Sequence, residues 1–219
     1  MKRFSQIFAV VLTLSLLAGC TKESYDKWLT SGTWNLNSYS LDQKKVVTTT
    51  YTGASVTQND VVTDETTQTL SGGNATTVTF HSDAPATGTT SSSTETDVSK
   101  ITTTVAFDKG GTYTQTNTSQ AVSTQLTTSP GTVGAVNNIT STPATTTNKN
   151  DWAWLEDGTI KDQINLAGWG LVMIKLTKSS MTLTYNPTTT TTQTLHDATF
   201  GDYTVTTTTT TTDTWTFGK

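Results

Sequence analysis

The alternation of apolar and polar residues is clearest between residues 169 and 185. Alternate side chains of a strand point to opposite faces, so a period of two with a polar break at residues 177–180 predicts a β-hairpin with one core-facing side. The positions on that side are Gly170, Val172, Ile174 and Leu176 before the break, and Met181, Leu183 and Tyr185 after it. Trp169, Leu171 and Met173 are apolar on the other side, so we expect the first arm to be covered on both faces over much of its length.

Similar but shorter patterns predict further strands. Residues 24–30 are expected to form one or two helical turns that place Trp28 and Leu29 against the bottom of a sheet, and a strand is expected to begin at Thr33. The inward-facing positions are Trp34 and Leu36, then Ile101, Val105 and Phe107, then Trp152 and Trp154, and then Ile160, Ile164 and Leu166. Consecutive hairpins form an up-and-down meander, which exposes two edges unless it closes. We therefore expect one all-β antiparallel domain that closes into a barrel.

Two regions are expected to be less regular. Residues 46–97 contain short strand candidates, which we interpret as an extra hairpin or two with a mobile loop near residues 84–96. These candidates are Val46-Val47, Val61-Val62 and Val78-Thr79-Phe80. Gly131, Gly134 and Pro143 disfavour regular structure, so residues 130–150 are expected to form a second long loop.

Threonine dominates the C-terminal part of the chain, with runs at residues 188–192 and 206–212 on either side of a turn near residues 197–202. We expect the two runs to pair as a hairpin faced with threonine. One face would carry Tyr203, Val205, Trp215 and Phe217, with Thr207, Thr209 and Thr211 between them. A buried hydroxyl without a partner costs on the order of 1–3 kcal/mol, so we expect the tip of this hairpin to project beyond the barrel into water.

The composition favours strands and excludes one class of function. Hydrophobic residues make up only 32% of the 219 residues and charged residues 14%, but 8% are aromatic and the abundant threonine is β-branched, which argues against disorder. The formal charge is -4, with no cluster of Lys or Arg that could hold phosphates. A nucleic-acid partner is therefore not expected.

The first residues have the layout of a signal peptide. Met1-Lys2-Arg3 is followed by an apolar run over residues 7–17, which is too short to cross a bilayer comfortably. Leu17-Ala18-Gly19-Cys20 follows directly and resembles the bacterial lipobox, with the only cysteine of the chain in its last position. The alternative is a short core helix with a buried thiol.

The lipobox resemblance implies cleavage before Cys20, a diacylglycerol on its sulfur and an acylated amino group. More than one acyl chain gives durable anchoring, so the mature protein would be tethered to a membrane through its N-terminal lipid. The expected organisation is a signal peptide at residues 1–19, a lipidated tether at residues 20–27 and a barrel at residues 28–219. Residues 21–23 also resemble the short signal that exports lipoproteins of Bacteroidota to the cell surface. The expected location is the outer membrane, on its periplasmic face or at the cell surface.

Several motifs in order resemble the lipocalin-like lipoproteins of Bacteroidota. They are the helical turn before Gly32-x-Trp34, the turn at residues 107–113, the Trp152-x-Trp154 strand and the stretch from residue 169 to 183. The resemblance implies an up-and-down lipocalin-like barrel whose end is closed by Trp28 and Trp34. In lipocalins the indole of this motif packs against an arginine near the last strand, but Arg3 is the only arginine here. Residues 46–97 also depart from the family pattern.

Catalytic chemistry is sparse in this sequence. His81 and His196 are the only histidines and Cys20 the only cysteine, so no metal site of the His and Cys type is expected, and no cofactor motif is found. Asp157-Gly158 is a turn signal, which also accounts for the neighbouring Glu156, and Asp162 lies on the following strand, whose polar residues alternate outward. His196-Asp197 could be a catalytic pair or part of a solvated loop.

The tryptophans are the stronger functional candidates, because an indole offers a broad apolar face with one polar handle. Trp34 and Trp154 are interpreted as core residues. Trp152, Trp169 and Trp215 are the candidate ligand-binding residues. We hypothesise a non-enzymatic lipoprotein that binds a small apolar or glycan ligand. The alternatives are a surface structural or adhesive lipoprotein that presents its Thr-rich loops, and an enzyme that acts on envelope glycans.

Overall fold

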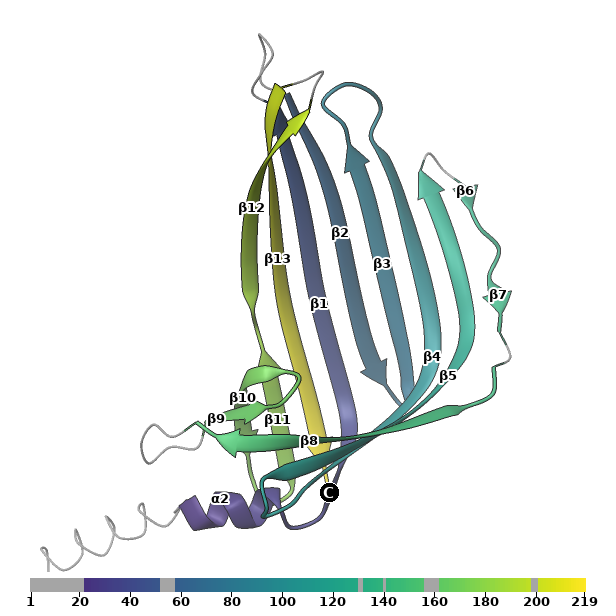
Figure 1. Ribbon diagram of the computed structural model, residues 1–219. Coiled ribbons are helices and arrows are strands. Elements are labelled where there is room, and N and C mark those ends of the chain that lie inside the picture. The colour runs from purple at the N-terminus through teal and green to yellow at the C-terminus, as the bar shows by residue number, and fades with distance from the viewer. Residues whose placement is uncertain (1–21, 52–57, 130–131, 140, 156–161, 198–200) are drawn as a thin grey trace, which may run out of the picture.

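The computed structural model describes residues 22–51, 58–129, 132–139, 141–155, 162–197 and 201–219 (Figure 1). In these residues a single helix, α2 (Lys22–Leu29), precedes one antiparallel sheet. The strands of the sheet are β1 (Thr33–Tyr51), β2 (Gln58–Ser71), β3 (Asn74–Ala84), β4 (Ser91–Phe107), β5 (Thr112–Ser129), β6 (Thr132–Val133), β7 (Asn137–Asn138), β8 (Ala144–Trp154), β9 (Gln163–Leu166), β10 (Gly170–Leu176), β11 (Ser180–Tyr185), β12 (Thr188–Asp197) and β13 (Gly201–Gly218). The predicted all-β antiparallel fold is confirmed. The predicted signal peptide and Cys20 lie outside the described residues.

One end of the sheet closes on itself, at the bottom of Figure 1. The ring runs from β1 through β4, β5, β8, β9, β10, β11 and β13 and returns to β1. It is closed by residues 33–35 of β1, which pair with residues 104–106 of β4, and by Leu36, which pairs with Phe217 of β13. We call this ring the closed barrel. Its closure removes the exposed edges that an open meander would leave.

The interior of the closed barrel is filled with apolar side chains. The buried residues are Leu29, Trp34, Val105, Phe107, Tyr113, Ile164, Leu166, Val172, Ile174, Leu176, Met181, Leu183 and Phe217. The β10–β11 hairpin supplies more of them than any other hairpin, and its register joins Ile174 to Leu183 and Leu176 to Met181. The predicted hairpin and its core-facing side are therefore confirmed.

The helix covers the lower end of this core. Leu29 and Trp34 are fully buried, and the Trp34 Nε1 donates a hydrogen bond of 2.9 Å to the Leu29 carbonyl oxygen. The Lys219 ammonium lies 4.2 Å from the centre of the Trp34 ring and donates to the Trp28 carbonyl oxygen at 2.8 Å. A lysine near the end of the chain thus supplies a cation over this indole.

Above the closed barrel the same sheet continues as a single open layer, which we call the open sheet. It consists of β12, β13, β1, β2, β3, β4 and β5 in that order, with β6 and β7 paired to β5 (Figure 1). The β2–β3 hairpin is inserted between β1 and β4, which pair directly only at residues 33–35 and 104–106. Its turn is Gly72-Gly73, with φ of 58° and 79°, as a two-residue hairpin turn with positive φ at both positions requires.

The threonine hairpin is confirmed, and it extends beyond the closed barrel as part of the open sheet. Its predicted tip at residues 198–200 lies outside the described residues. The Thr188–Asp197 strand pairs with residues 201–210 of β13, and all but its last residue are exposed. The register is the same as that of β11 with β13, so β11 and β12 form one line along β13 that is interrupted only at Asn186 and Pro187. The pairing of β1 with β13 over nearly the whole length of both strands was not expected from the sequence.

Three expectations about the strands were wrong. Leu171 and Met173 are 48% and 46% exposed, so the first arm of the hairpin is covered on one face only. Val46 and Val47 belong to the uninterrupted β1 rather than to a short separate strand. Residues 91–96 and 144–150, expected in loops, lie in β4 and β8. The last two differences have one cause, because hydrogen bonds to neighbouring strands extend β1, β4 and β8 beyond their apolar residues.

Candidate functional site

A cavity of about 320 Å³ lies between the packed core of the closed barrel and the open sheet. We call it the mouth cavity. Its lining residues come from β1, β2, β3, β4, β5, β8 and β13, and they are Leu36, Tyr39, Gln68, Leu70, Ala75, Ile101, Thr103, Asn117, Ser119, Thr146 and Trp215. Strands from both regions therefore meet around this single cavity.

Apolar and polar side chains lie next to one another around the cavity. Leu70 and Ala75 pair directly on β2 and β3. Ile101 of β4 pairs with Ser119 of β5, and Asn117 of β5 pairs with Thr146 of β8. No described lining residue bears a formal charge. The lining therefore suits an uncharged ligand that offers both apolar and hydrogen-bonding groups.

An aromatic cluster forms one end of the cavity. The Trp215 ring lies 4.4 Å from the Tyr39 ring and 4.7 Å from the Trp169 ring, measured between centroids. It also stacks above Phe217 at 6.3 Å and 11°. Phe217 belongs to the core of the closed barrel, so this cluster connects the cavity to the core and holds Trp215 in place.

Asp213 lies on the same face of β13 as Trp215, two residues away, and pairs with Leu41 and Tyr185 on the neighbouring strands. Burial raises the pKa of its carboxyl to about 6, and nearby donors from Trp215 and Tyr39 partly oppose this rise. The Asp213 Oδ1 and the Trp215 Nε1 are nonetheless buried without a partner in hydrogen-bond geometry. Burial, followed by the charge of Asp213, also raises the pKa of Tyr39.

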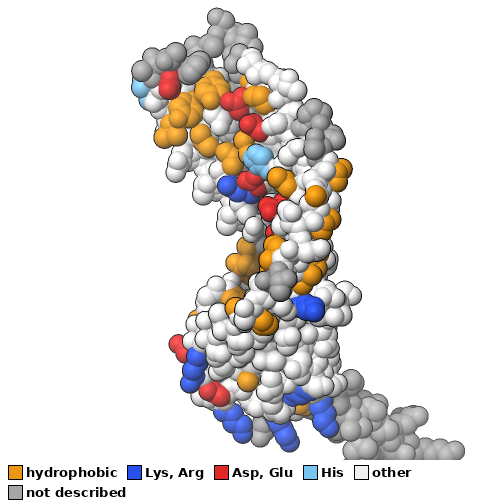
Figure 2. Space-filling view, turned by 90° about the vertical axis from the view of Figure 1, so that its right-hand side faces the viewer, with side chains coloured by type: hydrophobic (Ala, Val, Ile, Leu, Met, Phe, Trp, Pro, Cys, Tyr) orange, Lys and Arg blue, Asp and Glu red, His pale blue; other side chains and the backbone are white. Residues whose placement is uncertain are grey.

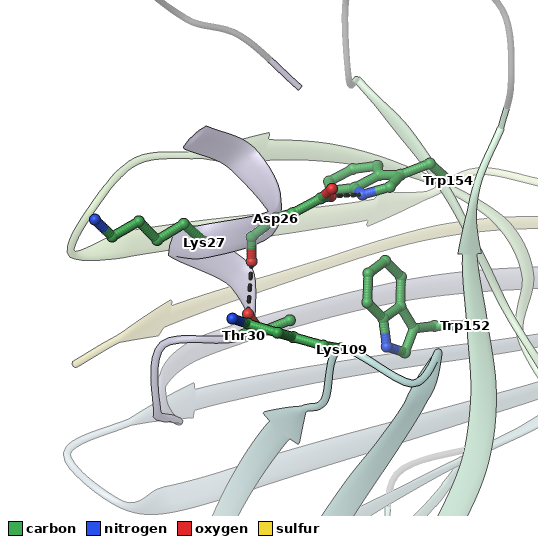
Figure 3. Close-up of a pocket in the computed structure, with 6 residues that line it drawn as sticks. All are labelled: Asp26, Lys27, Thr30, Lys109, Trp152 and Trp154. Carbon is green, nitrogen blue, oxygen red and sulfur yellow. Dashed lines mark hydrogen bonds between the residues drawn. The ribbon is translucent and has the colours of Figure 1, made fainter. Parts of the chain in front are cut away.

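A second cavity of about 410 Å³ lies at the base, between α2, the β4–β5 turn and β8 (Figure 3). We call it the base cleft. Its lining residues are Asp26, Lys27, Thr30, Lys109, Trp152 and Trp154. The Trp154 Nε1 donates to the Asp26 carboxylate, and the Trp152 Nε1 donates to the Asp108 carbonyl oxygen at 3.2 Å. Because both indole N–H groups are used within the protein, the base cleft offers mainly ring faces and two lysines.

The β4–β5 turn that borders the base cleft is built around Asp108. Its Oδ1 accepts hydrogen bonds from the Gly110 and Thr112 backbone N–H groups, at 2.8 and 3.0 Å. Hydrogen bonding, first from the Thr112 hydroxyl, lowers the pKa of the Asp108 carboxyl. The motif at residues 107–113 thus makes the turn that its sequence predicts.

The structure separates the three candidate ligand-binding tryptophans. Trp215 lines the mouth cavity and Trp169 packs against it, whereas Trp152 lines the base cleft together with Trp154. Trp154 was interpreted as a core residue, but it is only half-buried and borders that cleft. Trp28 packs against the core beside the fully buried Trp34.

The histidines and carboxylates considered as catalytic candidates do not form a common site in the described residues. His81 lies 2.7 Å from Asp64, and His196 lies 2.7 Å from Asp202 across the β12–β13 turn, both on exposed surface. Asp162 is exposed, and Glu156 and Asp157 lie outside the described residues. No group of three or more His, Cys, Asp or Glu in the described part of the chain is arranged to hold a metal ion.

Charge is distributed unevenly over the surface. Histidines and many acidic side chains lie in the upper half of the molecule, whereas most lysines in view lie at the lower end, with some acidic side chains among them (Figure 2). In the open sheet Asp64 pairs with Lys45 at 3.8 Å and with His81. These ion pairs are exposed, so each contributes little to stability.

Sequence reasoning missed most of the polar residues of the mouth cavity. Asp213 lies on the same face of β13 as Thr211 and Trp215, because the three residues are two positions apart. Its position beside the cavity could therefore have been predicted from the sequence of β13 alone. Gln68, Asn117 and Thr146 carried no such signal, because each lies in a polar stretch where both faces of the strand look alike. They meet only through the pairing of distant strands.

Comparisons with known proteins identify no family. No family model matches the chain, and no curated protein matches it. Among solved structures, the chain is similar to Neisserial surface protein A, with a TM-score of 0.21 and 6% sequence identity over 83% of this chain and 97% of that chain. The fold is therefore defined by its own strand pairing. No helix in the described residues has the length and apolar character needed to cross a membrane.

Proposed function

We propose that this protein is a lipid-anchored lipoprotein of the bacterial cell envelope that binds a small, uncharged ligand in its mouth cavity. The observation that carries this proposal is that apolar side chains, amides and hydroxyls line the same cavity without a charged lining residue. A glycan presents an apolar ring face and hydroxyl edges, and a small amphipathic lipid has a similar division. Both belong to the class of ligand that such a lining favours.

The aromatic cluster supports a stacking role for Trp215. An indole supplies a large apolar surface at a fixed orientation, and Trp169 and Tyr39 restrain it from two directions. Gln68 and Asn117 supply both hydrogen-bond donors and acceptors. The proposal assigns no catalytic residue, and it gives Trp152 a separate place in the base cleft.

Titration of the purified full chain with neutral oligosaccharides and with uncharged lipids tests the binding, followed by tryptophan fluorescence. Thr146→Trp places a bulky ring in the cavity and should abolish any response. Thr147→Trp is the matched control, because Thr147 is the exposed neighbour on the opposite face of β8. A full fluorescence response of the Thr146→Trp variant would exclude the mouth cavity as a binding site. So would the absence of any response of the unaltered chain to both the oligosaccharides and the lipids.

The lipid anchor rests on the lipobox-like sequence ending at Cys20 and on the short distance between Cys20 and α2. With α2 beginning at Lys22, an acylated Cys20 would hold the base of the barrel close to the membrane and leave the open sheet pointing away from it. Metabolic labelling with a fatty acid should mark the unaltered chain and not the Cys20→Ser variant. Equal labelling of both would remove the anchor from the proposal.

A surface structural or adhesive role is the second candidate. The observation that favours it is the open sheet, whose strand β12 exposes almost every side chain. Protease treatment of intact cells that carry a tagged protein separates the two locations, because a protein on the periplasmic face would be fully protected. The resemblance to lipocalin-like lipoproteins is compatible with either role.

A further inference from the structure

The strand β12 forms an outer edge of the sheet, at the left of Figure 1. Among the described residues only β13 pairs with it, through an unbroken register from Thr188–Thr210 to Asp197–Gly201. Its first eight residues, Thr188 to Leu195, carry no charge and contain no proline. Exposed edges of this length are usually protected by lysine, proline or a bulge, because their unpaired backbone groups can recruit another strand.

The register shows which backbone groups point outward. The Thr211 N–H donates to the Pro187 carbonyl oxygen at 3.0 Å, so residues 187 and 211 form a hydrogen-bonded pair. In an antiparallel ladder such pairs alternate with pairs that make no hydrogen bond to each other. The odd-numbered residues of β12 therefore bond to β13. The even-numbered residues direct their N–H and C=O groups away from the sheet, and these are Thr188, Thr190, Thr192, Thr194 and His196.

The opposite edge of the open sheet, formed by β5, is partly covered by other segments. The upper part of β5 is partly covered by β6 and β7, which pair with residues 127–128 and 123–124. No described segment covers β12 in this way. One edge is therefore partly covered by the chain itself, while the other remains available to a partner strand.

We propose that β12 pairs antiparallel with β12 of a second copy of this chain. A two-fold axis at Thr192 would pair Thr192 with Thr192 of the second copy, Thr190 with Thr194, and Thr188 with His196. Every outward-directed backbone group of β12 then gains a partner, as an isologous interface requires. The acidic residue of β12, Asp197, is at its end, so this register keeps the two His196-Asp197 ends apart and sets each against the uncharged start of the other strand.

A second copy fits this edge better than an unrelated strand does, because the edge is complementary to itself. Six of the residues from Thr188 to Leu195 are threonine. On one face the antiparallel pair sets Thr192 against Thr192 and Thr190 against Thr194, which is a favourable cross-strand arrangement of β-branched side chains. On the other face it sets Thr189 against Leu195 and Thr191 against Gln193, again without opposing two charges. Antiparallel pairing also sets the bases of the two copies at opposite ends. If the lipid anchor proposed above holds, the pair joins copies held on two facing membranes.

A cysteine cross-link in the purified full chain in detergent tests this register. Thr192→Cys should give a disulfide-linked dimer on oxidation, because hydrogen-bonded partners lie about 5.5 Å apart between Cα atoms, which is within the range for a disulfide. Thr188→Cys is the matched control, since it is also exposed but would lie about 26 Å from its equivalent, eight residues along the strand. Equal dimer with both variants, or none with Thr192→Cys, would overturn the proposal.

Two proline variants test the interface without a cross-link, by sedimentation of the full chain. Thr192→Pro removes an outward N–H and leaves the hydrogen bonds to β13 in place, so it should shift the dimer to monomer while thermal unfolding changes little. Thr191→Pro removes a hydrogen bond to β13 and should lower the unfolding temperature. An unaltered chain that is monomeric at every concentration tested would also overturn the proposal. The unaltered chain also serves as the control for oxidation. A disulfide-linked dimer of the unaltered chain would form through Cys20, so it would argue against the lipid anchor and not against the pairing of β12.

Discussion

The closed barrel and the open sheet share β1, β4, β5 and β13 but are stabilised in different ways. In the closed barrel one face of each strand carries large apolar side chains that bury one another. In the open sheet these strands carry mostly threonine and other polar residues with few large apolar side chains, and no second layer covers it among the described residues (Figure 1). Hydrogen bonding between neighbours and β-branched side chains therefore extend the strands far beyond the core that anchors them.

Strand β13 shows the difference within one element. Phe217 is 1% exposed and packs in the core, whereas Thr209 at the same period of two lies among the threonines of the open sheet. Both residues are paired on both sides, Phe217 with β1 and β11 and Thr209 with β1 and β12. The two positions thus share their backbone environment and differ in burial of the side chain.

The largest expected effect comes from truncation within this strand. Phe217→Ala should lower the free energy of unfolding by about 3–5 kcal/mol, because it removes a buried ring and leaves a cavity. Thr209→Ala should change it by less than about 0.5 kcal/mol. Denaturant unfolding of the two variants measures both. Equal losses would mean that the open sheet contributes as much side-chain packing as the barrel.

The second prediction concerns the turn of the inserted hairpin. Gly73 has a φ of 79°, and a Cβ at this position would meet no atom within 4 Å, so Gly73→Val should cost about 1–2 kcal/mol through the backbone alone. Ser71→Val is the control, because no residue other than glycine has a positive φ in the described chain. Amide exchange should quicken in β2 and β3 while the closed barrel stays protected. Uniform loss of protection would show that the two regions unfold together.

The third prediction concerns the carboxyl at the junction of the two regions. The Asp213 pKa is about 6 in the folded protein against an ordinary value of 3.8, so the folded state binds the proton more tightly. Stability should then fall as pH rises from about 4 to about 6, by about 1–2 kcal/mol after allowance for solvent screening. The Asp213→Asn variant should be more stable than the unaltered chain by this amount at pH 7, and by little at pH 3.5. Parallel pH profiles of the two proteins would contradict this role.

The smallest expected effect comes from the base of the barrel. Lys219→Met removes the cation over Trp34 and its hydrogen bond to the Trp28 carbonyl oxygen, and it should lower stability by about 0.5–1 kcal/mol. Lys178→Met, in the exposed turn between β10 and β11, is the control for the loss of one positive charge. Identical unfolding midpoints would show that the contact with Trp34 contributes nothing measurable.

The parts of the fold that could be predicted are those with local signals. The β10–β11 hairpin carried a clear alternation, and the Asp108 turn carried the glycines and the carboxylate that such a turn needs. The extent of β4 and β8 could not be predicted, because Ser91 to Thr96 and Ala144 to Asn150 are polar on both faces and become strands only beside their partners. For the same reason the polar lining residues of the mouth cavity could not be predicted.

Local signals in the chain were enough to define the all-β class, most of the residues that face the core of the barrel, and the position of a threonine hairpin. These features follow from side-chain alternation and turn chemistry, which act over a few residues. Long-range strand pairing was needed for the rest: β1 closes the ring against β4 and β13, the mouth cavity has an uncharged lining, and β12 is left as an edge. Those features depend on which distant strands share hydrogen bonds, and a threonine-rich sequence specifies many such pairings almost equally well until the apolar core selects one.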